Sequence, residues 1–148
     1  MSKTISGVET EDCIIVVQGT VLDGADWSAY TAWAREAAAT RQPKKILVCS
    51  AGSALTAKQR AEVNSIYSWK PTLGICSVSS PLTRGTVTAL SWLMGANMRM
   101  FGYDALDECM TWLDIPVSRH VVIKERVWKE QIALGFPLSR AKAPSLAS

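Results

Sequence analysis

Short apolar blocks alternate with longer stretches of helical periodicity along this 148-residue chain. Short apolar runs, most of them with β-branched residues, predict strands at residues 4–8, 13–21, 46–49 and 72–78, and partial apolar/polar alternation predicts one at 98–101. Apolar residues at helical spacing predict helices at residues 27–40, 57–69, 81–94, 105–113 and 119–134. The pattern therefore alternates strands with helices after an initial pair of strands.

The stretch 44–69 shows the repeating unit most clearly. Residues 46–49 are four apolar residues in a row, as expected for a strand covered on both faces. A small-residue turn at 50–55 follows. Thr56 and Gln59 then have the spacing of a capping box, which opens a helix. Strand, loop and capped helix together make a βα unit. Asp26, Asp104 and Ser118 are the expected N-caps of the first, fourth and last helices.

Successive units of this kind predict an α/β fold with a single mixed, mostly parallel sheet of about five strands and helices on its faces. The first two strands form an antiparallel hairpin at one edge. The expected domain covers residues 1–116, followed by a helical extension at 117–136. Apolar residues surround much of that extension, so it packs on the domain or on a second subunit as a homodimer contact. The composition of residues 137–148 predicts a disordered tail.

Composition narrows the function classes. Hydrophobic residues make up 48% of the chain and charged residues 20%, and the net charge of +3 comes from scattered basic residues. A nucleic-acid groove needs a denser basic face, so no nucleic-acid partner is expected. No apolar run approaches the ~20 residues that span a bilayer, and no apolar segment follows the first four residues. We therefore expect a cytoplasmic protein without a membrane span.

Residues with catalytic or metal-binding chemistry are sparse. Cys13, Cys49, Cys76 and Cys109 lie far apart without a CxxC pair, so free buried thiols are expected, and no metal or cofactor. The one histidine, His120, has no evident carboxylate partner in sequence and is expected at the surface or an interface. The six tryptophans are expected mainly in packing, with Trp69 and Trp128 as the alternative interface residues: Trp27, Trp33, Trp69, Trp92, Trp112 and Trp128.

The order of elements and the residue types in segments 57–60 and 82–90 resemble those of the STAS domains, the family of anti-sigma-factor antagonists. The resemblance covers about residues 4–115 and implies a non-enzymatic regulatory or scaffold module that acts through protein contacts. A kinase or an anti-sigma-like regulator is the implied partner. In that family a loop serine or threonine after the third strand is phosphorylated. Here the same place holds Ser50 and Ser53, without the family's preceding aspartate.

A second candidate site follows the strand at 72–78. Ser79, Ser80, Thr83 and Arg84 lie at the start of a predicted helix, where free N–H groups and the helix dipole attract anions. Plain capping by Ser80 with a solvent-facing Arg84 is the alternative. Both candidate loops lie at the carboxyl edge of the predicted sheet, where open α/β folds bind ligands. STAS-like folds are similar to CRAL-TRIO lipid-binding domains, so the alternative function is binding of an anionic or lipid-like small molecule.

Overall fold

The structure is a computed structural model, and its described residues are 4–19, 22–51, 55–68, 70–77 and 97–135. In this part of the chain five strands form one sheet: β1 (Ile5–Glu9), β2 (Ile14–Gln18), β3 (Lys45–Ser50), β4 (Thr72–Ser77) and β5 (Met98–Gly102). The helices are α1 (Gly24–Thr40), α2 (Ala57–Ile66), α4 (Leu106–Trp112) and α5 (Val117–Ala133). The predicted α/β class with a mixed, mostly parallel sheet is confirmed. The predicted helix at 81–94 and the predicted tail at 137–148 lie outside the described residues.

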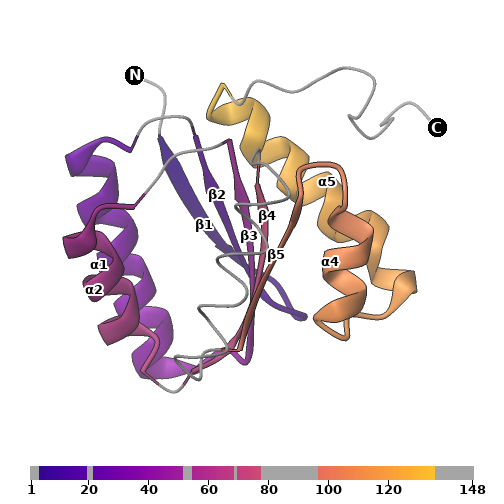
Figure 1. Cartoon of the computed structure of the whole chain (residues 1–148), viewed down its shortest axis with the longest axis horizontal. Coiled ribbons are helices and arrows are strands. Elements are labelled where there is room, and N and C mark those ends of the chain that lie inside the picture. Colours follow the sequence, from indigo (N-terminus) through magenta and orange to yellow (C-terminus); the bar gives the residue numbers. More distant parts are fainter. Residues whose placement is uncertain (1–3, 20–21, 52–54, 69, 78–96, 136–148) are drawn as a thin grey trace.

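The strands lie in the sheet in the order in which they occur in the chain. β1 pairs antiparallel with β2, and β2, β3, β4 and β5 are parallel to one another. Because each parallel strand is added on the same side of the last, α1 and α2 both cross over the same face of the sheet. Figure 1 shows these two helices on one side and α4 with α5 on the other.

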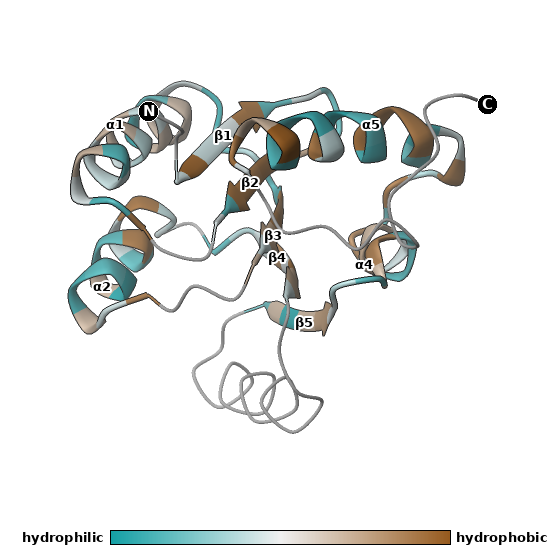
Figure 2. Ribbon diagram, turned by 90° about the horizontal axis from the view of Figure 1, so that it is seen from above, coloured by the Kyte–Doolittle hydropathy of each residue, from teal (hydrophilic) through white to brown (hydrophobic). Residues whose placement is uncertain are grey.

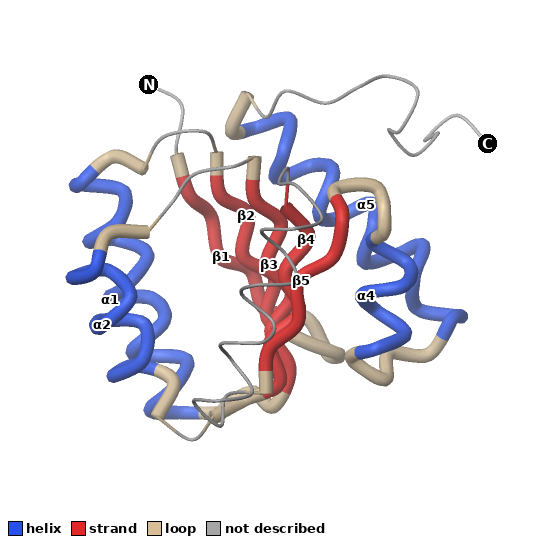
Figure 3. Tube along the Cα trace, in the orientation of Figure 1, coloured by secondary structure: helices blue, strands red, loops and turns tan. Residues whose placement is uncertain are grey.

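Each face of the sheet has its own hydrophobic core, because alternate residues of a strand point to opposite faces. Ile46 and Val48 of β3 join the core under α1 and α2, whereas Leu47 and Cys49 join the core under α4 and α5. The prediction that residues 46–49 are covered on both faces is therefore correct. Figure 3 shows the strands enclosed between the two helical layers.

The second layer is divided between its two helices. Helix α4 contacts β4 and β5, whereas α5 crosses the same face of the sheet toward its other edge and contacts β2. The buried residues Ile123 and Val127 attach α5 to the body. Packing of this helix on the domain is therefore observed, and contact with a second subunit stays a prediction. The separation of the two helices leaves the ends of β3 and β4 between them.

The helix starts agree only in part with the predicted caps. Thr56 and Gln59 form the predicted capping box at α2. Helix α1 is capped by Asp23 instead of Asp26, because the carboxylate of Asp26 accepts hydrogen bonds from the backbone N–H and hydroxyl of Thr4. Helices α4 and α5 begin without a side-chain cap, so the predicted roles of Asp104 and Ser118 are wrong. Within the described residues no helix is both long and apolar enough to cross a membrane.

Candidate functional site

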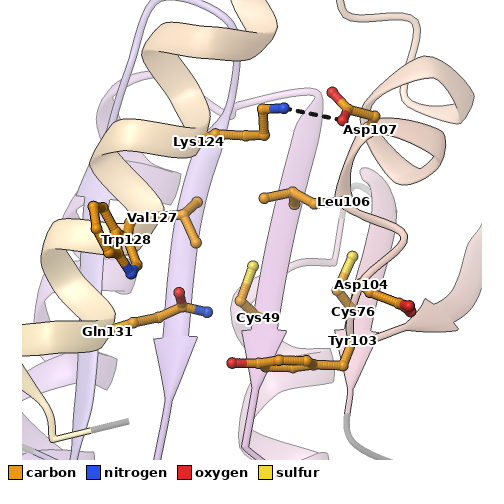
Figure 4. A pocket seen from close by; sticks show the side chains of 10 residues that line it. All are labelled: Cys49, Cys76, Tyr103, Asp104, Leu106, Asp107, Lys124, Val127, Trp128 and Gln131. Atoms are coloured by element: carbon orange, nitrogen blue, oxygen red, sulfur yellow. Dashed lines mark hydrogen bonds and ion pairs between the residues drawn. The ribbon is translucent and has the colours of Figure 1, made fainter. Parts of the chain in front are cut away.

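A cavity of about 140 Å³ lies between the sheet and the second helical layer. Its floor is formed by Cys49 and Cys76, each the next-to-last residue of its strand, and these two residues are paired in the β3–β4 register. Tyr103 and Asp104 line it from the turn after β5. The remaining lining residues come from α4 and α5: Leu106, Asp107, Lys124, Val127, Trp128 and Gln131. The cavity is therefore at the carboxyl ends of three parallel strands (Figure 4).

Two polar groups of α5 at this cavity have no hydrogen-bond partner within the described residues. Gln131 is only 8% exposed, and its carboxamide makes no hydrogen bond within the described part of the chain. The indole Nε1 of Trp128 is buried and has no partner there either. Buried polar groups in proteins are nearly always paired, and leaving one unpaired costs roughly 1–3 kcal/mol. The Trp128 nitrogen is such a group, and the Gln131 carboxamide, three residues further along the same helix, lines the cavity without a partner in the described chain.

Tyr103 completes the polar part of the wall. Its phenol oxygen points toward Gln131 in Figure 4. Burial, followed by the nearby Cys49, raises the pKa of Tyr103, so the hydroxyl keeps its proton at neutral pH. An indole N–H, a carboxamide and a neutral phenol thus lie at the cavity. These are uncharged groups that recognise a molecule by hydrogen bonding.

The four cysteines are free and buried, as predicted, but they are not isolated from one another. All four belong to the core under α4 and α5. The thiols of Cys109 and Cys49 favour the thiolate of Cys76 and lower its pKa, against the effect of burial. The contact with Cys76 and burial raise the pKa of Cys49, and burial raises the pKa of Cys13 to about 11. Cys76 is therefore the most acidic thiol of the cluster.

A charged network closes the cavity at the side where α4 meets α5. Asp107 Oδ2 accepts a hydrogen bond from Lys124 Nζ at 3.0 Å, and Asp107 Oδ1 lies 3.0 Å from His120 Nδ1. Burial raises the pKa of Asp107, but the hydrogen bonds and charges of Lys124 and His120 outweigh it, and the net pKa is lowered. The ammonium of Lys124 is thus already engaged by a carboxylate.

His120 was expected at the surface or an interface, and a surface position is wrong. The side chain is buried, with Nε2 lying 3.0 Å from the carbonyl oxygen of Ile115 and Nδ1 facing Asp107. The partner was invisible in sequence because it lies 13 residues away on another helix. Since both neighbours of the ring are acceptors, both hydrogen bonds form only when both ring nitrogens carry protons.

The residues predicted as sites lie elsewhere or outside the described chain. Ser50 follows Cys49 directly, is only 4% exposed and, by strand alternation, faces the α1 and α2 side. Ser53 lies in 52–54, and Ser79, Ser80, Thr83 and Arg84 lie in 78–96, all outside the described residues. Phosphorylation of Ser50 or Ser53 stays a prediction. The sequence analysis named Trp128 as an alternative interface residue and not as part of a ligand site. Nothing in the sequence pattern marked Gln131 as a site residue.

Comparison with known proteins does not assign the chain to a family. No protein-family model and no curated protein sequence matches the chain. The resemblance to STAS domains therefore stays a prediction. Within the described residues, no group of three or more His, Cys, Asp or Glu side chains is arranged to hold a metal ion.

Proposed function

We propose that this protein is a non-enzymatic binding module that takes up a small molecule in the cavity between β3, β4, α4 and α5. The observation that carries the proposal is the Gln131 carboxamide, which lines the cavity and has no hydrogen-bond partner within the described residues. A bound molecule with matching hydrogen-bonding atoms would supply that partner, next to the buried and unpartnered indole N–H of Trp128. This is the ligand-binding alternative of the sequence analysis, at the same edge of the sheet but with other residues.

The composition of the wall supports binding as the role of this site. Val127 and Leu106 supply apolar surface, whereas Trp128, Gln131 and Tyr103 supply a few convergent polar groups. Apolar walls with a small number of placed polar groups are typical of small-molecule sites. Lys124 and Asp107 at the cavity are hydrogen-bonded to each other and tie α5 to α4. A ligand held between these helices would stabilise their arrangement.

The test is a screen of small ring compounds against the ¹⁵N-labelled full chain, read by NMR at the indole N–H of Trp128. A Trp128→Phe variant identifies that resonance. We expect saturable shifts that are lost in Leu106→Trp, a variant that fills the cavity from α4. Exposed Lys129→Ala on α5 is the matched control and should bind as wild type does. A screen without any saturable binder, or with binders unaffected by Leu106→Trp, would overturn the proposal.

A second candidate function, a regulatory or scaffold module acting through protein contacts, is favoured by one face of α5. Val117, Val121 and Ile132 are 75%, 61% and 58% exposed. At 3.6 residues per turn they fall within one row along the helix, and Figure 2 shows how apolar and polar segments alternate on it. The row suits contact with a second copy of the chain, as expected for the homodimer alternative.

Sedimentation velocity tests this second candidate. If the row joins two copies, the full chain sediments as a dimer and Val121→Asp gives a monomer. Val122 is 50% exposed but points about a quarter-turn away, so Val122→Asp is the matched control and should remain dimeric. A monomeric wild-type chain, or equal effects of the two variants, would exclude this mode of self-association.

A further inference from the structure

We infer that Cys76 is a thiol that a small hydroperoxide oxidises, and that Cys49 then forms a disulfide with it. The two residues lie side by side on the floor of the cavity, next to the carboxyl ends of β3 and β4. This oxidation site goes beyond the proposed binding of a small molecule and does not depend on it. Its basis is the strand register, the position of a third thiol and the difference in acidity between the thiols.

The register of the sheet brings Cys49 and Cys76 together. They are direct partners in the parallel pairing of β3 with β4. Neighbouring strands lie about 4.7–4.9 Å apart, which is within the range of about 4.4–6.8 Å between the Cα atoms of disulfides. Both side chains belong to the core under α4 and α5, and Figure 4 shows their sulfur atoms directed to the same side. A disulfide can therefore form here without a large movement of the backbone.

A third thiol, that of Cys109, reaches Cys76 from α4. A Cβ atom at Gly74 would lie 2.6 Å from Cys109 Sγ, so the missing side chain at Gly74 makes room for this thiol against β4. Gly74 precedes Cys76 by two residues and therefore lies on the same face of the strand. The thiols of Cys109 and Cys49 both form hydrogen bonds with the Cys76 side chain. Cys76 is thus the central member of the three.

The difference in acidity determines which thiol attacks first, because the thiolate is the nucleophile. The hydrogen bonds from Cys109 and Cys49 lower the pKa of Cys76 to about 5, against the effect of burial. The contact with Cys76, followed by burial, raises the pKa of Cys49. At neutral pH Cys76 is therefore the attacking thiolate, and Cys49 keeps its proton beside it. A thiolate next to a second, resolving thiol is the arrangement found in peroxide-sensing cysteines.

The cavity provides the space for the oxidant. Both thiols line it, and its volume of about 140 Å³ exceeds the roughly 30 Å³ that one water molecule occupies in the liquid. Hydrogen peroxide has only one oxygen atom more than water, so it fits between the sheet and α5. The larger side chains at the cavity, among them Trp128, limit the oxidant to small hydroperoxides.

The reaction takes place in two steps. The Cys76 thiolate attacks one oxygen of the hydroperoxide, so that an S–O bond forms and the O–O bond breaks, and the leaving oxygen takes up the proton that Cys76 released. Sulfur is thereby oxidised to a sulfenic acid, and the hydroperoxide is reduced to water and, where it carries an organic group, to an alcohol instead. The Cys49 sulfur then attacks Cys76, an S–S bond forms, and the hydroxyl leaves as water with the proton of the Cys49 thiol.

The test uses the full chain treated with hydrogen peroxide at pH 7. Remaining thiols are blocked under denaturing conditions at each time point, and the peptides are mapped by mass spectrometry. We expect Cys49 and Cys76 to be lost together as one disulfide, at least about tenfold faster than Cys13 is oxidised. Cys13 is the internal reference, because burial raises its pKa to about 11 and it does not line this cavity.

Three variants assign the roles of the thiols. Cys49→Ala should accumulate a sulfenic acid on Cys76, which dimedone traps, because the resolving thiol is gone. Cys76→Ala should leave Cys49 reduced, because the attacking thiolate is gone. Cys13→Ala is the matched control, and it should form the same disulfide as the wild-type chain.

The mapping on the wild-type chain does not depend on how well any variant folds. A disulfide between Cys76 and Cys109 would overturn the role of Cys49, and oxidation of Cys13 as fast as Cys76 would overturn the site. In urea the lead of Cys76 should disappear, because the fold supplies its neighbours, and a lead that persists there would also contradict the inference. These readouts need no bound ligand, so their failure is distinct from failure of the proposed binding function.

Discussion

Asp107 on α4 and His120 on α5 are joined by a 3.0 Å contact between Oδ1 and Nδ1, and the same carboxylate holds Lys124 through its other oxygen. One side chain of α4 thus fixes two residues of α5 that lie one turn apart. The contact closes one side of the cavity and sets the spacing of the two helices that form its walls.

This relationship predicts an acid-sensitive contribution to stability. The pKa of Asp107 is lowered in the folded chain, from an ordinary value of about 3.9 when unfolded. A lowered folded pKa gives stability that is present above the unfolded pKa and is lost as pH falls through the folded value. Asp107→Asn should therefore lower the free energy of unfolding at pH 7, with a smaller loss at pH 3. Urea titrations across this range measure it.

Glu108 provides the control, because it is exposed in the same turn of α4 and makes no ion pair within the described residues. Glu108→Gln should change the stability little, and by similar amounts at both pH values. A deficit of Asp107→Asn that is equal at pH 3 and pH 7 would show that the carboxylate charge does not contribute.

Gln131 predicts a conflict between binding and stability. The Gln131 side chain is largely buried, and its carboxamide lines the cavity without a partner in the described chain, so Gln131→Leu removes a polar group and adds apolar surface there. We expect the variant to be more stable than wild type by about 1 kcal/mol. Chemical denaturation of the ligand-free chain measures this. A clear destabilisation would mean that the carboxamide is satisfied in solution, for example by ordered water.

The thiol cluster predicts an order of reactivity. The thiolate is the reactive form, and Cys76 has a lowered pKa and lines the cavity. Cys13 has its pKa raised to about 11 and does not line the cavity. Iodoacetamide at pH 7 should therefore modify Cys76 before Cys13, as mapped by peptide mass spectrometry over time. Prior modification of Cys13, or equal rates at all four thiols, would contradict this order.

Gly74 predicts a packing requirement under α4. A Cβ atom at this position of β4 would lie 2.6 Å from Cys109 Sγ and 3.2 Å from a Leu113 methyl carbon, both in fully buried side chains. Gly74→Ala should cost about 1–3 kcal/mol in unfolding free energy, because the core must move to accept it. Gly24→Ala is the control, since nothing lies within 4 Å of a Cβ there. Comparable stability of the two variants would contradict this account.

The fold was largely predictable, because local patterns determine most of it. The apolar run at 46–49, the capping box at Thr56 and the repeated βα spacing each act over a few residues, and the structure has the strands and helices they indicate. The predicted cap at Asp26 was mistaken because a competing contact decides which carboxylate caps α1. Asp26 is taken by Thr4, 22 residues away.

The site was less predictable, because it depends on where α5 lies. Gln131 reads in sequence as an ordinary polar helix residue, and it becomes unusual only because α5 turns it toward the ends of β3 and β4. The cavity lies at the carboxyl edge of the sheet, but β2 to β5 follow one another without the reversal of strand order at which ligand sites of open α/β sheets usually form. The cavity arises instead from the separation of α4 and α5.

The chain-ordered sheet also bears on how the molecule folds. Each strand pairs with its predecessor in sequence, so the sheet can grow from β1 onward through contacts of modest sequence separation. Helix α5 is the exception: Glu130 bonds Ser6 across 124 positions and Arg119 bonds Asp12 across 107. Docking of α5 forms the contacts of longest sequence separation, so we expect it to be the slow step of folding. The cavity is complete only after α5 has docked. A ligand bound in the cavity would slow unfolding that begins with the release of this helix.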